Sequence, residues 1–161
     1  KAHKTAKACG IKLICGAEFV LDEAPLLTDT PGSRCRLILL APNRQAYGKI
    51  SSLISKLRKR SDKGTYYLTR HDLQVGLSEC LGIWICEGQG VEQLSAIGAH
   101  LQSLIPRLWI GLGLFHDGQD LHKTASALTL SSALKLPIVA VNDVHTHCPE
   151  RQGLQNIVSA I

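Results

Sequence analysis

Acidic and imidazole side chains stand at two points where the sequence predicts the end of a strand. Glu18 lies three residues beyond the apolar run 11–15, and Asp143 and His145 directly follow the apolar run 137–141. Alternate residues of an extended chain point to the same side, so Asp143 and His145 project together. A carboxylate and an imidazole can share one zinc, manganese or iron ion. Glu18 could complete that shell or bridge two ions, and two-metal sites activate water for phosphoester hydrolysis.

Two further histidines follow these predicted strand ends. His147 faces the same way as His145 but lies farther from its strand, and His116 comes just after the predicted strand 108–115 as a further candidate ligand. The alternative to a metal site is that the Asp-x-His segment caps the next helix and Glu18 pairs with a surface lysine. His116 would then be an exposed loop histidine. The spacing alone leaves both interpretations open.

Short apolar segments alternate with segments of helical periodicity along the chain. Ile50, Leu53, Ile54 and Leu57, for example, follow the i, i+3, i+4, i+7 spacing of an amphipathic helix. Strands without clean alternation, separated by helices, predict an α/β fold with a buried parallel sheet, either open or closed as a (β/α) barrel. In both folds functional groups gather at the carboxyl ends of the strands. The predicted strands are 11–15, 37–41, 81–86, 108–115 and 137–141, and loops are expected at 22–33 and 142–149. The predicted helices are 3–9, a helix that follows Asn43 and carries its apolar face at 50–57, 69–75, 91–104, 121–134 and 154–161.

Composition limits the class of protein. The 161 residues are 45% hydrophobic and 19% charged, which excludes a disordered tail, a collagen or a coiled coil. No apolar run approaches the ~20 residues that span a bilayer. The six cysteines form no C-x-x-C pair, which favours reduced, buried thiols in a cytoplasmic protein over a disulfide framework. Methionine is absent even at position 1, so we expect an internal piece of a longer protein or a processed chain.

One basic segment supplies most of the net charge of +5. Residues 56–63 contain five lysines and arginines against one aspartate. Such a cluster can follow a phosphate backbone through counterion release. The alternative is a solvated helix end and turn. The candidate DNA-contacting residues are Lys56, Arg58, Lys59 and Arg60.

Several stretches of the chain resemble one family. Residues 10–18 (GIKLICGAE) resemble the G-I-K-x-I-x-G-x-E segment of the PHP (polymerase and histidinol phosphatase) domain. Residues 37–54 are similar to the L-L-A-x-N…G-Y…L-I stretch of bacterial DNA polymerase III alpha-type chains. Residues 63–69 (KGTYYLT) and 145–161 look like the error-prone branch of these C-family polymerases. The resemblance implies that 1–161 is a partial PHP domain, the N-terminal module of a several-fold longer polymerase, with a distorted (β/α)-barrel fold that lacks its first strand or strands.

The resemblance also implies a site and partners. Glu18, Asp143 and His145 match PHP metal-site positions, and His116 lies near another; the metal would be zinc or manganese. The parent chain would use magnesium, DNA and deoxynucleoside triphosphates in damage-induced translesion synthesis, in the cytoplasm, with accessory proteins of the damage response and no membrane.

The chain departs from the family pattern at two places. Arg36 stands where active PHP domains place a histidine, and a guanidinium has no lone pair to give to a cation. The opening H-x-H and the T-D-H segment would lie before residue 1. We therefore expect a scaffold with weak or partial metal binding and an inactive isolated segment. The alternatives are a free-standing, histidinol-phosphatase-like phosphoesterase and a purely structural or partner-binding domain.

Overall fold

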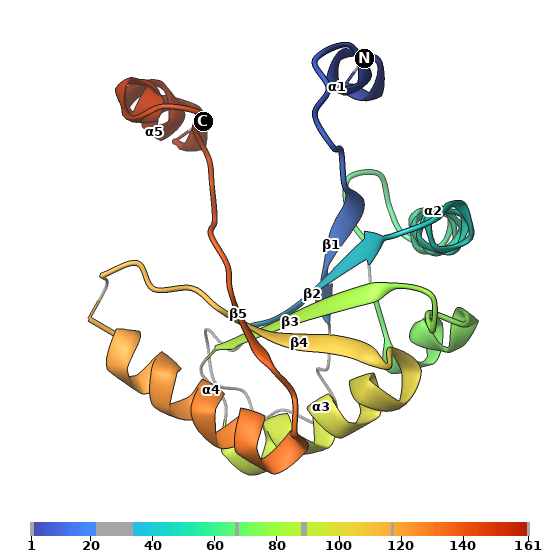
Figure 1. Ribbon diagram of the computed structural model, residues 1–161, viewed down its shortest axis with the longest axis vertical. Coiled ribbons are helices and arrows are strands. Elements are labelled where there is room, and N and C mark those ends of the chain that lie inside the picture. The colour runs from blue at the N-terminus through green and yellow to red at the C-terminus, as the bar shows by residue number, and fades with distance from the viewer. Residues whose placement is uncertain (1, 22–33, 67, 88–89, 117, 161) are drawn as a thin grey trace.

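The computed structural model describes residues 2–21, 34–66, 68–87, 90–116 and 118–160, and it shows a mixed α/β fold built on one five-stranded sheet (Figure 1). The predicted loop 22–33 lies outside the described residues. The strands are β1 (Cys15–Leu21), β2 (Arg34–Ala41), β3 (Leu81–Glu87), β4 (Arg107–Leu112) and β5 (Ile138–Ala140). The helices are α1 (Ala2–Ala8), α2 (Arg44–Lys59), α3 (Val91–Leu104), α4 (Asp120–Leu134) and α5 (Gln152–Ser159), with short 3-10 turns η1 (Arg70–Val75) and η2 (Pro149–Arg151).

The sheet is mixed, so the prediction of a wholly parallel sheet is wrong. Its order is β1-β2-β3-β4-β5; β2 runs antiparallel to both of its neighbours, and β3, β4 and β5 are parallel. The reason for the error is visible in β2. Cys35, Leu37 and Leu39 are buried on one face, while Ile38 and Leu40 on the other face are also apolar, so the alternation that marks an antiparallel strand is hidden.

The order of the described strands is linear, with β1 and β5 at its two edges. The (β/α) barrel that the resemblance implies is therefore not confirmed. Because β2 alone is reversed, β1 still points the same way as β3, β4 and β5. The carboxyl ends of these four strands therefore lie at the same end of the sheet.

One face of the sheet carries the hydrophobic core. The register places Leu37 opposite Trp84, and both side chains are fully buried. Helix α2 packs on β1 and β2, and α3 and α4 pack on each other and on β4 (Figure 1). Gly98 of α3 has no room for a Cβ, which would meet Trp84 and Leu134 within 2.7 Å. This close approach explains why a glycine stands in the middle of a helix.

The predicted strand 11–15 is the one clear error of position. Strand β1 begins at Cys15, and Ile11 and Ile14 are 66% and 70% exposed. The inward-facing side chains of β1 come later, at Phe19 and Leu21. Gly16 and Glu18 stand on the other face of the strand, after the continuous apolar run has ended. Glu18 is consequently in the middle of a strand rather than beyond its end.

Other predicted elements are confirmed within a few residues. Helix α1 ends before Gly10, whose φ of 67° suits a glycine. Thr69 caps η1 as predicted. Strand β5 covers only three residues and is half-buried to exposed, so the prediction of a buried strand over 137–141 is correct in place but not in burial. Among the described helices, none has the length and apolar character needed to cross a membrane.

Candidate functional site

Glu18 and Arg36 meet on the face of the sheet opposite the core. Glu18 pairs with Ile38 and Arg36 pairs with Val20, so the two side chains are diagonal neighbours on adjacent antiparallel strands. The Nη1 atom of Arg36 lies 3.5 Å from Oε1 of Glu18. The sequence left a surface lysine as the alternative partner of Glu18; the actual partner is this arginine.

Asp143 reaches the same guanidinium from the segment that follows β5, and His145 contacts Asp143. The Oδ2 atom of Asp143 lies 4.0 Å from Nη1 of Arg36 and 3.3 Å from Nε2 of His145. Glu18 and Asp143 thus both contact Arg36, and His145 joins them through Asp143; we call these four residues the Arg36 centre. Glu18 and Asp143 therefore lie near each other, as the sequence predicts, and metal binding by these residues stays a prediction.

The Arg36 centre is open to solvent. The side chains of Glu18, Asp143 and His145 are 46%, 53% and 59% exposed, and that of Arg36 is 23% exposed. Water therefore screens these ion pairs, and each contributes little to stability. The arrangement is one that could change its partners at low cost in free energy.

A cation does not fit the Arg36 centre as it stands. The guanidinium lies within reach of both carboxylates, where a metal ion would have to bind, and it carries a permanent positive charge without a lone pair. Among the described residues, no group of three or more histidine, cysteine, aspartate or glutamate side chains is arranged to hold a metal ion. The Arg36 centre as it stands therefore does not fit the cation on which hydrolysis would depend.

His116 has its contacts elsewhere. The carboxylate of Asp120 accepts hydrogen bonds from the backbone N–H groups of Phe115 and His116, at 3.2 and 3.0 Å. His116 itself has a φ of 56°, and its side chain is 98% exposed, with Nδ1 3.9 Å from Asp120. The contacts that the structure gives it are those of a loop histidine at the start of α4. Its role as a metal ligand stays a prediction.

The basic segment surrounds a carboxylate that the sequence did not single out. Asp72 is fully buried, and it accepts hydrogen bonds from Arg60 Nη1 at 2.8 Å and from the hydroxyl and backbone N–H of Thr69 at 2.8 and 3.0 Å. Arg60 Nη2 donates to Oδ2, which both Thr69 groups also reach, and Lys56 Nζ lies 3.1 Å from Oδ1. We call Asp72, Arg60, Lys56 and Thr69 the Asp72 centre. The spacing Thr-x-x-Asp, a capping box, is the signal that could have found it.

Burial and hydrogen bonding act in opposite directions on the pKa of Asp72. Burial alone would raise its pKa, but the hydrogen bonds from Arg60, from Thr69 and from Lys56 outweigh burial and hold the pKa well below its usual range. The carboxylate is therefore ionised at neutral pH. Arg60 and Lys56 hold η1 against the end of α2.

A third cation of the basic segment also has a contact within the fold. Arg58 donates to the carbonyl of Thr65 at 3.2 Å, and its guanidinium lies over the ring of Tyr66, 5.6 Å from the centroid. Of the candidate DNA-contacting residues, Lys56, Arg58 and Arg60 thus take part in contacts within the fold, although all four, Lys59 included, are exposed. The structure favours a fold-stabilising role for three of the four; DNA contact stays a prediction.

The known proteins that resemble this chain share one name, error-prone DNA polymerase. No protein-family model matches the chain. The chain is similar over its whole length to part of several error-prone DNA polymerases. The error-prone DNA polymerase of Methylococcus capsulatus is 39% identical over 163 residues, that of Pseudomonas aeruginosa 36% over 162, and that of Dechloromonas aromatica 34% over 167. Each match covers 100% of this chain but only 14–15% of the polymerase, so the chain spans about a seventh of the length of these relatives.

Proposed function

We propose that this chain is a PHP-domain segment of an error-prone DNA polymerase and that it serves there as a scaffold with a vestigial metal site. Two observations support the proposal. The similarity to proteins named error-prone DNA polymerase runs along the entire chain. In the Arg36 centre two candidate metal ligands, Glu18 and Asp143, lie beside a guanidinium, which has no lone pair to give to a cation.

The second observation carries the proposed loss of function. A site for hydrolysis needs its carboxylates and imidazoles to share a cation. Here Glu18 and Asp143 share a guanidinium instead, with Nη1 at 3.5 and 4.0 Å. An arginine can replace the charge of an ion between two carboxylates and hold β1, β2 and the segment after β5 together. It cannot polarise a phosphoryl oxygen by coordination or ionise a bound water.

The activity of the longer chain follows as part of the same proposal. It would extend DNA primers from deoxynucleoside triphosphates with magnesium in a separate catalytic domain, during translesion synthesis in the cytoplasm, alongside accessory proteins of the damage response. Zinc or manganese would bind the segment only weakly or partially, because Arg36 repels a cation at Glu18 and Asp143.

The experiment that tests the scaffold role uses the longer polymerase that contains this segment. Because a vestigial site takes no part in chemistry, Glu18→Gln combined with Asp143→Asn should leave primer extension within about twofold of the unmodified enzyme. Asp62→Asn is a matched control, an exposed acidic residue outside both centres. A loss of about tenfold or more in the double variant, with the control unchanged and the variant still folded, would reject the scaffold role.

The same residues define the alternative, a metal-dependent phosphoesterase, because Glu18, Asp143 and His145 do converge. The 161-residue chain is incubated with manganese or zinc and p-nitrophenyl phosphate, and release of nitrophenolate is followed. We expect no turnover above that of the metal alone. Turnover that disappears in Asp143→Asn would show a working hydrolytic site and replace the scaffold by the phosphoesterase.

A further inference from the structure

Two cysteines lie directly opposite each other on β2 and β3, two adjacent inner strands of the sheet. Cys35 of β2 and Cys86 of β3 are Cα partners in the antiparallel register, next to the pair formed by Leu37 and Trp84 on the same face. Neither belongs to a disulfide in the structure. Cys86 packs against the hydrophobic cluster that contains Cys35. Two thiols in this relation have a chemistry that neither the Arg36 centre nor the Asp72 centre uses.

The register brings this pair within the range of a disulfide. Directly opposite residues of antiparallel strands have Cα atoms about 4.5 to 5.5 Å apart, according to whether the pair is hydrogen-bonded. Disulfides span Cα separations of about 4.4 to 6.8 Å, so both kinds of pair fall inside the window. Cys35 is the second residue of β2, and Cys86 is the second from the end of β3. A small adjustment is easier there than in the middle of a strand.

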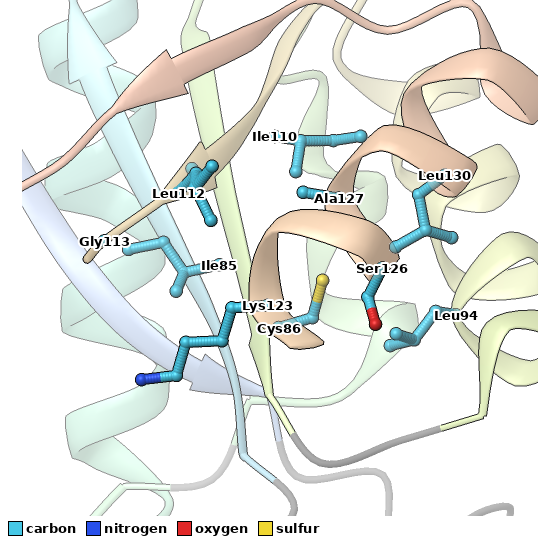
Figure 2. Close-up of a pocket in the computed structure, with 11 residues that line it drawn as sticks. Ile85, Cys86, Leu94, Ile110, Leu112, Gly113, Lys123, Ser126, Ala127 and Leu130 are labelled. Carbon is cyan, nitrogen blue, oxygen red and sulfur yellow. The ribbon is translucent and has the colours of Figure 1, made fainter. Parts of the chain in front are cut away.

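The two thiols differ in access. Cys35 is only 1% exposed, whereas Cys86 is half-buried. Cys86 lines a cavity of about 30 Å³ between β3, β4 and α4, and Lys123 and Ser126 line the same cavity (Figure 2). That volume admits a molecule the size of water or hydrogen peroxide. A thiolate is the form of a cysteine that reacts, and Cys86 is the more accessible of the two thiols.

We propose that Cys35 and Cys86 form a reversible cross-strand disulfide when the chain meets a hydroperoxide. The Cys86 thiolate attacks one peroxide oxygen, the O–O bond breaks, and Cys86 becomes a sulfenic acid while hydroxide leaves. The Cys35 thiolate then attacks the sulfur of Cys86, the S–S bond forms, and the second hydroxide leaves. The two thiols together lose two electrons and two protons, and the peroxide is reduced to two waters.

The bond would link the interior of the fold to the Arg36 centre. Cys35 immediately precedes Arg36 on β2, and the loop that the disulfide closes contains α2 and η1. Oxidation would fix the register of β2 against β3 beside the guanidinium. A thiol reductant breaks the disulfide by thiol–disulfide exchange, so the Cys35–Cys86 bond persists only while the oxidant is present.

The direct test uses the unmodified chain. It is treated with hydrogen peroxide, its remaining thiols are blocked with iodoacetamide, and its peptides are analysed by mass spectrometry with and without dithiothreitol. We expect a disulfide-linked pair of peptides that contain Cys35 and Cys86. Its mass should be two hydrogens less than the summed masses of the two reduced peptides, and dithiothreitol should separate the two. Alkylated Cys35 and Cys86 in a sample whose exposed Cys9 and Cys15 are fully oxidised would overturn the proposal.

Matched variants test the order of the two steps. In Cys35→Ala, peroxide should leave a sulfenic acid on Cys86 that dimedone traps. In Cys86→Ala, Cys35 should remain unmodified over the same time. Oxidation of Cys35 at an unchanged rate in Cys86→Ala would contradict entry through Cys86. The triple variant Cys9→Ala, Cys15→Ala, Cys148→Ala should keep the linked peptide pair, and its loss there would also contradict the assignment.

Discussion

The Asp72 centre and the Arg36 centre both place arginine against carboxylate, yet they differ in burial and stoichiometry. Asp72 is a single, fully buried carboxylate with two cations and two Thr69 donors around it. Arg36 is a single cation between two carboxylates that are about half exposed, at 3.5 and 4.0 Å. Asp72 thus has several hydrogen-bond donors to itself, whereas Glu18 and Asp143 share the guanidinium of Arg36.

This difference separates a structural centre from one that can change its partners. Removing a group from a buried, hydrogen-bonded ion pair leaves the other group without compensation and is costly. Removing one from an exposed pair lets water take its place, and the cost is small. The Asp72 centre therefore stabilises the fold, whereas substitutions in the Arg36 centre should change the free energy of unfolding little.

The largest expected effect is the loss of the buried carboxylate. Asp72→Ala removes the hydrogen bonds to Arg60 and to both groups of Thr69. Lys56 and Arg60 are 46% and 40% exposed and can turn to solvent, which limits the cost. We expect the free energy of unfolding to fall by about 3 kcal/mol. Urea denaturation followed by tryptophan fluorescence measures it.

The matched control for that experiment is the exposed carboxylate. Asp143→Ala should change the free energy of unfolding by less than about 0.5 kcal/mol. Equal losses in Asp72→Ala and Asp143→Ala would contradict the division into a structural and an exchangeable centre.

The two arginines provide a second, smaller contrast. Arg60→Ala leaves Asp72 buried with Lys56 as its remaining cation, and should cost about 2 kcal/mol. Arg36→Ala leaves exposed carboxylates and should cost about 0.5 kcal/mol or less. Urea denaturation of both variants at one pH gives the comparison. A larger loss for Arg36→Ala than for Arg60→Ala would reverse the assignment of the two centres.

Acid should weaken the Asp72 centre in a defined direction. The folded-state pKa of Asp72 is lowered, so its contribution is fully present above the ordinary carboxyl pKa and is lost as the pH falls toward the folded-state value. Asp72→Asn cannot titrate. The stability difference between the unmodified chain and Asp72→Asn should therefore be constant from about pH 7 to 5 and shrink below about pH 4. Urea denaturation at stepped pH measures it, and parallel curves down to pH 3 would contradict the lowered pKa.

The sequence predicted the elements better than their pairing. Helical periodicity and capping placed α2 and η1 within a few residues, because those signals are local. Strand direction was missed because β2 is apolar on both faces. The strand β1 was placed too early because the continuous apolar run ends before Gly16, whereas β1 itself alternates, with Glu18 on its outward face. Pairing direction depends on contacts between distant residues, which a local pattern does not contain.

Three of the predicted site residues lie near one another in the structure, and their metal binding stays a prediction. Residue types and spacing singled out Glu18, Asp143 and His145, and the resemblance drew attention to Arg36. That Arg36 contacts both carboxylates depends on the antiparallel register of β1 and β2. The Asp72 centre was missed because its cations lie up to 16 positions before the carboxylate and were interpreted as a surface cluster.

Metal affinity of Arg36→His tests most directly whether Arg36 takes the place of a cation. Replacing the guanidinium by an imidazole removes the repulsion and adds a ligand beside Glu18, Asp143 and His145. Calorimetric titration with manganese or zinc should show at least about tenfold tighter binding than to the unmodified chain, with Arg36→Ala between them. The gain should disappear when Asp143→Asn is added. Equal affinities of the unmodified chain and Arg36→His would contradict the account.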